Sequence, residues 1–198
     1  NLRSGDPEAL IRGVSTDSRA MSPGHIFWAL KGERFDGHDF LDQALENGAG
    51  VVSNAWGPII GYSYVPMPDV VREAVDLFVE DARGGRGGVV CFAAGNYSES
   101  IWLDGYAGYY NTVAVTASTD HGLFADYSNF GRSIEVNAPA HGAGGIWTTD
   151  RTGFSGYNPG YLYETSGDYT RDFTGTSAAV SMVAGVYGLV FSMENLTG

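Results

Sequence analysis

The stretch Val89-Val90-Cys91-Phe92-Ala93-Ala94-Gly95-Asn96 decides the fold class of this sequence. Its first six residues form an uninterrupted apolar run, which is typical of a parallel strand that is covered on both faces. The run stops at a Gly-Asn pair. A polar side chain at the carboxyl end of a strand lies where open α/β sheets usually bind ligands. The stretch therefore predicts a central strand with an amide group at its functional end.

Strand and helix patterns alternate along the rest of the chain. Short apolar runs predict strands, and apolar residues at helical spacing predict helices, the second of them capped by Asp69. We expect further strands at 26–30, from 50, at 112–117 and at 134–139, and helices at 40–45, 70–82 and 178–191. The alternation predicts a three-layer αβα fold with a mainly parallel sheet, preceded by a small N-terminal α/β unit. Gly185 and Gly188 are expected to bring the last helix close to the sheet.

Charge and cysteine content exclude several functions. The 198 residues contain 11 Lys and Arg against 23 Asp and Glu, a formal net charge of −12. This balance excludes a nucleic-acid partner and argues against binding to an anionic membrane surface. Cys91 is the only cysteine, so neither an internal disulfide nor a cysteine zinc site can form. No stretch is expected to reach the ~20 apolar residues of a membrane span. We therefore expect no membrane partner.

A second polar segment, Thr174-Gly175-Thr176-Ser177, precedes the last apolar helix. A serine there has its hydroxyl and its backbone N–H at the positive end of a helix dipole. This placement suits a nucleophile and half of an oxyanion hole. Taken alone, such a serine is more often an ordinary helix cap, and a Gly-Asn pair is more often a simple turn.

Together and in this order, the two segments carry a resemblance. Residues 53–198 resemble the C-terminal part of the catalytic domain of subtilisin-like serine peptidases, especially the kexin-like branch. The matching text is SNAWGP from Ser53, VCFAAGN from Val90, DGYA from Asp104, VAVTASTD from Val113, YSNFG from Tyr127, NAP from Asn137, and GTSAA from Gly175. The resemblance implies that Ser177 is the nucleophile and that Asn96 donates its side-chain amide to the oxyanion.

The same resemblance implies an extended peptide as the substrate. The residues that it assigns to peptide binding are Asn54, Ala55, Trp56, Gly57, Ala94, Gly95 and Thr176. The chain departs from the family at Ala55, where serine is usual, and at Ser181, where proline is usual. No cofactor is expected, with calcium on the loop carboxylates Asp104, Asp126, Asp150 and Asp168 as the alternative. The family is usually secreted, but the chain shows no signal peptide, so its location stays open.

The other two members of a catalytic triad are missing from the sequence. Subtilases carry the Asp in an Asp-Ser/Thr-Gly turn and the His in a His-Gly-Thr-His segment, and neither motif occurs here. His121 and His141 fall in segments that match surface loops, where we expect them to be solvated. The sequence therefore predicts a chain that is inactive as a peptidase when alone.

A different resemblance covers residues 13–52, which are similar to the N-terminal domain of Mur ligases. The matching text is VSTDSR from Val14, SPG from Ser22, and ALKGERFDGHDF from Ala29. It implies a segment that binds a UDP-sugar through Ser18, Arg19, Asp36 and His38. ATP-dependent ligation is excluded, because a P-loop needs a Gly-Lys-Ser/Thr sequence and the single lysine, Lys31, precedes Gly32 and Glu33.

The two resemblances divide the chain into residues 1–52 and 53–198. The division falls inside an apolar Val51-Val52 strand, so we expect the first segment to replace the missing first half of the peptidase sheet. Three readings stay open: a partial peptidase, a UDP-N-acetylmuramoyl-peptide binding module, and a recombined or engineered chimera without activity.

Overall fold

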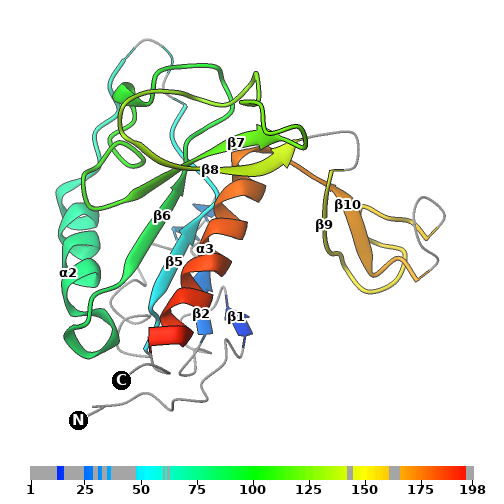
Figure 1. The fold of residues 1–198 in the computed structure, drawn as a ribbon, viewed down its shortest axis with the longest axis horizontal. Helices are drawn as coiled ribbons and strands as arrows, with labels where there is room; N and C mark the ends of the chain where they lie inside the picture. Colours follow the sequence, from blue (N-terminus) through cyan, green and yellow to red (C-terminus); the bar gives the residue numbers. More distant parts are fainter. Residues whose placement is uncertain are drawn as a thin grey trace.

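A six-stranded parallel sheet forms the centre of the computed structural model (Figure 1). The structure describes residues 13–15, 25–28, 31–32, 35–36, 48–59, 61, 63–141, 145–160 and 166–194. In spatial order the strands are β1 (Gly13–Ser15), β2 (His25–Trp28), β5 (Val51–Asn54), β6 (Val89–Ala93), β7 (Val113–Thr119) and β8 (Ile134–His141). Every neighbouring pair is parallel. The expected α/β fold with a mainly parallel sheet is confirmed.

The N-terminal segment belongs to the same sheet as the rest of the chain. Phe27 of β2 pairs with Val52 of β5, and Trp28 pairs with Ser53. This confirms the expectation that the first segment supplies strands beside β5. A short antiparallel pair, β3 (Lys31–Gly32) with β4 (Phe35–Asp36), lies between these strands in the sequence. The expected helix at 40–45 lies outside the described residues.

Two helices cover opposite faces of the sheet (Figure 1). Because successive side chains of a strand point to opposite faces, β6 contributes to two cores. Val90 and Phe92 pack in a cluster with Val75 and Phe78 of α2 (Asp69–Gly85). Cys91 and Ala93 pack with the first turns of α3 (Gly175–Glu194). This arrangement is the three-layer αβα architecture.

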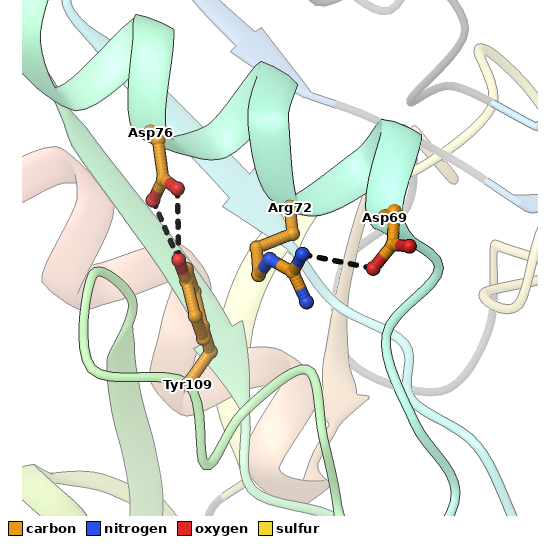
Figure 2. A network of polar contacts seen from close by, with 4 residues as sticks. All are labelled: Asp69, Arg72, Asp76 and Tyr109. Atoms are coloured by element: carbon orange, nitrogen blue, oxygen red, sulfur yellow. Dashed lines mark hydrogen bonds and ion pairs between the residues drawn. The ribbon is translucent and has the colours of Figure 1, made fainter.

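Helix α2 differs from its predicted form at its start. Its N-cap is Pro68 and makes no side-chain cap, so the prediction that Asp69 caps this helix is wrong. Asp69 lies in the first turn instead, where its carboxylate pairs with Arg72 at 2.8 Å (Figure 2). At the other end, the backbone leaves helical geometry from Ala82 to Gly84, which agrees with the predicted end of the helix at residue 82.

A two-stranded antiparallel sheet, β9 (Ile146–Thr149) with β10 (Tyr169–Phe173), projects from the body of the molecule (Figure 1). No strand was predicted at either position from the sequence. β10 leads directly into α3, so the arm is attached to the helix that carries Ser177. A single 3-10 turn, η3 (Ile101–Leu103), lies in the loop between β6 and β7.

Helix α3 is longer than the predicted helix at 178–191. The segment Gly175–Met193 is long and apolar enough to cross a membrane by length and composition alone, with a mean hydropathy of 1.5. The expectation that no stretch reaches this size is therefore wrong. The helix packs against β5, β6, β7 and β8, and a core helix of this kind passes the same test. Gly188 is buried, whereas an added Cβ at Gly185 would meet no atom within 4 Å. Only one of the two glycines is therefore close to other parts of the chain.

Candidate active site

The two segments singled out in the sequence meet at the carboxyl end of β6. The hydroxyl of Thr176 links them, because it accepts a hydrogen bond from the Gly95 backbone N–H at 3.2 Å and donates to Asn96 Oδ1 at 2.9 Å. The Thr176 backbone N–H also donates to Asn96 Oδ1, at 2.9 Å. These contacts join residues that are 80 or 81 positions apart in the sequence. Asn96 is thus fixed to the residue that precedes Ser177.

The hydrogen bonds of Asn96 determine what its side chain has left to offer. Within the described part of the chain, both side-chain bonds of Asn96 use the Oδ1 atom. An amide group has two further donors on its nitrogen. The Nδ2 group lies against Gly175, where an added Cβ would be 3.3 Å from it. Asn96 is exposed, so its two N–H donors can reach a ligand at the start of α3.

Ser177 lies in the first turn of α3, two residues after the helix begins at Gly175. Its hydroxyl donates a hydrogen bond to the backbone carbonyl of Ala55 at 3.0 Å, across 122 positions of sequence. This bond places the serine at the carboxyl end of β5, beside the strand that the sequence analysis assigned to peptide binding. A helix N-terminus at this point also directs free backbone N–H groups toward the same space.

The residues assigned to peptide binding are placed differently from one another. Asn54 is fully buried, and its Nδ2 donates to the Cys91 carbonyl at 3.0 Å, so its side chain stabilises the sheet. Trp56 is half-buried, and its ring meets those of Phe92 and Tyr106 edge-on at 5.4 Å. Gly57 is exposed, and a Cβ built on it would lie 3.4 Å from Asp104 Oδ2. The backbone from 55 to 57 is the part that a peptide could reach.

Ala94 and Gly95 continue β6 toward Asn96. Ala94 is fully buried, and its N–H donates to the Val115 carbonyl at 2.9 Å. Gly95 has a φ of +101°, in the region that favours glycine. A Cβ there would also lie only 2.5 Å from Asn129 Nδ2. Glycine is therefore required at this position for two independent reasons.

Asn129 is a supporting residue whose role no sequence pattern predicted. It is 1% exposed, and its Oδ1 accepts hydrogen bonds from the backbone N–H groups of Tyr97 and Glu99, each at 3.0 Å. Its own backbone N–H donates to the Gly95 carbonyl at 2.9 Å. Three bonds from one residue therefore hold the loop that carries Asn96. An asparagine in a polar loop gives no sequence signal that distinguishes this role from an ordinary turn.

No imidazole hydrogen-bonds to the Ser177 hydroxyl within the residues that the structure describes. His141 is exposed and packs edge-on against the Tyr127 ring, with centroids 5.2 Å apart. His121 is exposed and lies 3.9 Å from an Asp120 carboxylate oxygen. Both are surface residues, as expected. His25 lies in β2, and the UDP-sugar candidates Ser18, Arg19 and His38 lie outside the described residues, as does the side chain of Asp36.

Ser181 compensates locally for the proline that is usual at its position. Its hydroxyl donates to the Ser177 carbonyl at 2.8 Å, one helical turn back. Serine hydroxyls make this type of bond in helix interiors, and it fixes the side chain without removing the backbone N–H. The turn that carries Ser177 is thus tied at Ala55, at Asn96 through Thr176, and at Ser181.

Two of the carboxylates considered for calcium, Asp104 and Asp150, accept hydrogen bonds from loop backbone groups. Asp104 is buried, and its Oδ1 accepts the Tyr106 and Ala107 N–H groups at 2.7 and 3.1 Å. Burial raises the pKa of this carboxyl, and the two backbone bonds partly oppose the rise. Asp150 accepts from the Asn158 N–H at 2.7 Å, which lowers the pKa of its carboxyl. Among the described residues, no three or more His, Cys, Asp or Glu side chains gather as a metal site.

The comparisons with known proteins agree with this geometry. The Subtilase family (Peptidase_S8) matches this sequence along residues 2–197, nearly the whole chain. The chain belongs to the subtilase family. It is 41% identical over 174 residues to the calcium-dependent protease of Trichormus variabilis. The matched stretch covers 79% of this chain and 26% of that protein. This subtilase chain thus spans about a quarter of the length of that relative.

The N-terminal segment has different relatives. It is 62% identical over 42 residues to the UDP-N-acetylmuramoyl-tripeptide–D-alanyl-D-alanine ligase of Escherichia coli, a match that covers 21% of this chain and 9% of the ligase. The combination of a subtilase match with a partial Mur ligase match is consistent with a chimera-like chain.

Solved structures support the subtilisin-like fold. The serine protease of Aeromonas sobria superposes with a TM-score of 0.70 at 20% identity, over 82% of this chain and 34% of that one. The prenylagaramide maturation protease PagA superposes with a TM-score of 0.59 at 24% identity, over 84% of this chain and 52% of that one.

Proposed function

We propose that this subtilase chain is the nucleophile-bearing half of a subtilisin-type serine endopeptidase, which binds extended peptides but lacks its own general base. The observation that carries the proposal is the double hydrogen bond from Thr176 to Asn96 Oδ1, because it leaves Nδ2 at the start of α3, next to Gly175. In the proposed reaction, Ser177 Oγ attacks the peptide carbonyl carbon. The oxyanion that forms accepts from Asn96 Nδ2–H and from the Ser177 backbone N–H.

The missing base limits this reaction. When Ser177 Oγ attacks, its proton must pass to an acceptor that becomes the acid for the leaving amine. The present acceptor is the Ala55 carbonyl oxygen. A backbone carbonyl is too weak a base to hold that proton, so the serine stays a weak nucleophile. We therefore propose that the chain alone hydrolyses peptides very slowly, through oxyanion stabilisation without an activated serine.

An activated peptidyl p-nitrophenyl ester and a fluorophosphonate probe test both halves of the proposal. We compare the wild-type chain with Ser177→Ala and Asn96→Ala, and expect slow ester hydrolysis in the wild type and a fall of about 10²–10³-fold in Asn96→Ala. Ser177→Ala should also be slower than the wild type, because water must then attack in place of the hydroxyl. We also expect fluorophosphonate labelling to be slow. Rapid stoichiometric labelling that Ser177→Ala abolishes would mean that a base is present. Equal rates in all three proteins would refute the proposed oxyanion site.

A second candidate is binding of a UDP-N-acetylmuramoyl peptide by residues 13–52. The 62% identity to the E. coli ligase over 42 residues favours it, and the assigned side chains are Ser18, Arg19, Asp36 and His38. Calorimetry with UDP-N-acetylmuramoyl tripeptide tests it, and no heat of binding at millimolar ligand would remove it. We propose that residue 52 divides two segments of different ancestry. The same position does not divide two folding units, since β2 and β5 pair as parallel neighbours in one sheet.

A further inference from the structure

One residue of the loop that carries Asn96 has an unusual backbone conformation. Ser98 has a φ of +53°, in the left-handed region that favours glycine. Among the described residues, Ser98 and Arg83 are the only residues other than glycine with a positive φ. Ser98 follows Asn96 by two positions. Strained backbone of this kind concentrates at functional sites, where the surrounding contacts hold it in place.

Two hydrogen bonds hold Ser98 in this conformation. Its backbone N–H donates to the Tyr127 carbonyl at 2.9 Å, and its hydroxyl donates to the Asp126 carbonyl. Both acceptors lie in the segment that also carries Asn129. The left-handed region is unfavourable for a residue with a Cβ atom, and these bonds offset that cost. The conformation of Ser98 is therefore maintained by its contacts with a neighbouring segment.

The chain that follows Ser98 is fixed to the body of the molecule. The Glu99 backbone N–H donates to Asn129 Oδ1 at 3.0 Å, and the Glu99 carbonyl accepts the Phe130 N–H at 3.0 Å. A change of φ at Ser98 rotates the chain before this residue relative to the chain after it. Because the part after Ser98 is held on both sides of Glu99, the part before it must move. That part includes Asn96.

The backbone, more than packing, determines where Asn96 lies. Asn96, Tyr97 and Ser98 are all exposed, so no core contact fixes them. Gly95, at the near end of the loop, is held by the bond from its N–H to the Thr176 hydroxyl. Only three residues therefore lie between two fixed ends. The two bonds from Thr176 to Asn96 Oδ1 can form only when the backbone angles of these three residues bring the amide to the start of α3.

We propose that Ser98 is a positioning residue, whose left-handed backbone directs the Asn96 amide toward the oxyanion that forms at Ser177. Ser98 acts through Asn96 and not by contact with the substrate. The inference rests on the proposed function, since it needs Asn96 as the oxyanion donor.

Two substitutions at Ser98 separate its backbone conformation from its side chain. Glycine adopts a positive φ without steric cost, so Ser98→Gly should keep kcat for the p-nitrophenyl ester within about threefold of the wild type. Valine is β-branched and strongly disfavours a φ of +53°. Ser98→Val should lower kcat by about tenfold or more, up to the loss of about 10²–10³-fold expected for Asn96→Ala. KM should not change, because the contact with the oxyanion is made only in the transition state.

A double substitution shows whether the effect passes through Asn96. In the Asn96→Ala chain, adding Ser98→Val should change kcat by less than about twofold, because no amide is left to misplace. The matched control is Ser155→Val, which should keep the kcat of the wild type, since Ser155 is exposed in the loop between β9 and β10 and has no positive φ. Ser98→Ala is the milder variant if valine prevents folding. It removes the bond to Asp126 and should lower kcat by about two- to tenfold.

The outcomes separate this inference from the proposed function. A wild-type kcat in Ser98→Val and in Ser98→Ala would overturn the inference, and so would equal losses in Ser98→Val and Ser98→Gly. A loss of similar size when Ser98→Val is added to Asn96→Ala would place the effect outside the oxyanion site and also overturn it. Failure of the proposed function has a different sign, an unchanged kcat in Asn96→Ala itself, and both proposals then fall.

Discussion

Asn129 offers the sharpest test of how the site is held together. Substituting Asn129→Ala removes the Oδ1 atom that accepts the Tyr97 and Glu99 N–H groups at 3.0 Å each. A buried donor left without an acceptor costs about 1–3 kcal/mol. Tyr97 itself is exposed, so water can reach part of this loop and the lower end of the range applies. Because two N–H donors lose their acceptor, we expect the free energy of unfolding to fall by about 2–3 kcal/mol in total.

Urea unfolding followed by tryptophan fluorescence measures this change. With a denaturant slope of about 2 kcal/mol/M, the midpoint should fall by about 1 M. Asn137→Ala is the matched control, because Asn137 is exposed on β8, and its midpoint should stay within ~0.25 M of the wild type. Hydrogen exchange should also accelerate at Tyr97 and Glu99. If Asn129→Ala unfolds at the same urea concentration as Asn137→Ala, the two side-chain bonds of Asn129 do not hold the Asn96 loop and the reasoning is wrong.

Two further substitutions test the groups around this loop. Thr176→Val keeps the shape of a fully buried side chain but removes the hydroxyl between Gly95 and Asn96, and it should lower the free energy of unfolding by about 1–2 kcal/mol. Thr176→Ser should restore most of that loss, and full stability in the valine variant would contradict the assigned bonds. Asp104→Asn tests the buried carboxyl, whose pKa is raised by burial from an ordinary value of 3.8. Because the folded state holds this proton more tightly than the unfolded state, the wild type should gain stability relative to Asp104→Asn as the pH falls from 7 through the raised pKa. A difference between the two that is constant from pH 7 to pH 4 would refute the effect of burial.

Continuous apolar runs made the fold readable from the sequence. The strand at 89–94 was predictable because both of its faces are buried, and the structure has it as β6 (Val89–Ala93). The β9–β10 arm was not, because its exposed and buried residues alternate over only four or five positions. The N-cap at Asp69 was mistaken because Pro68 already has the extended backbone that a cap needs, which leaves Asp69 inside the first turn.

The proximity of Asn96 and Ser177 was predictable only through a resemblance. Nothing local in either segment indicates the other, since Thr176 joins them across 80 residues. The supporting role of Asn129 depends on its burial, which a polar residue among loop residues does not signal. The exposed apolar side chains of α3, such as Leu189 and Met193, also escaped prediction. By composition they are indistinguishable from the apolar residues of the same helix that pack on the sheet.

The long sequence separations within the site determine when it can form during synthesis. Ala55 and Asn96 leave the ribosome well before Thr176 and Ser177, whose hydrogen bonds to them span 122 and 80 residues. Contacts of such high order form late, after the intervening strands have found their neighbours. In a nascent chain, Ser177 therefore cannot be positioned beside the Asn96 loop until residues 174–177 have been synthesised. This order of synthesis keeps the proposed nucleophile apart from the Asn96 loop while the sheet is still forming.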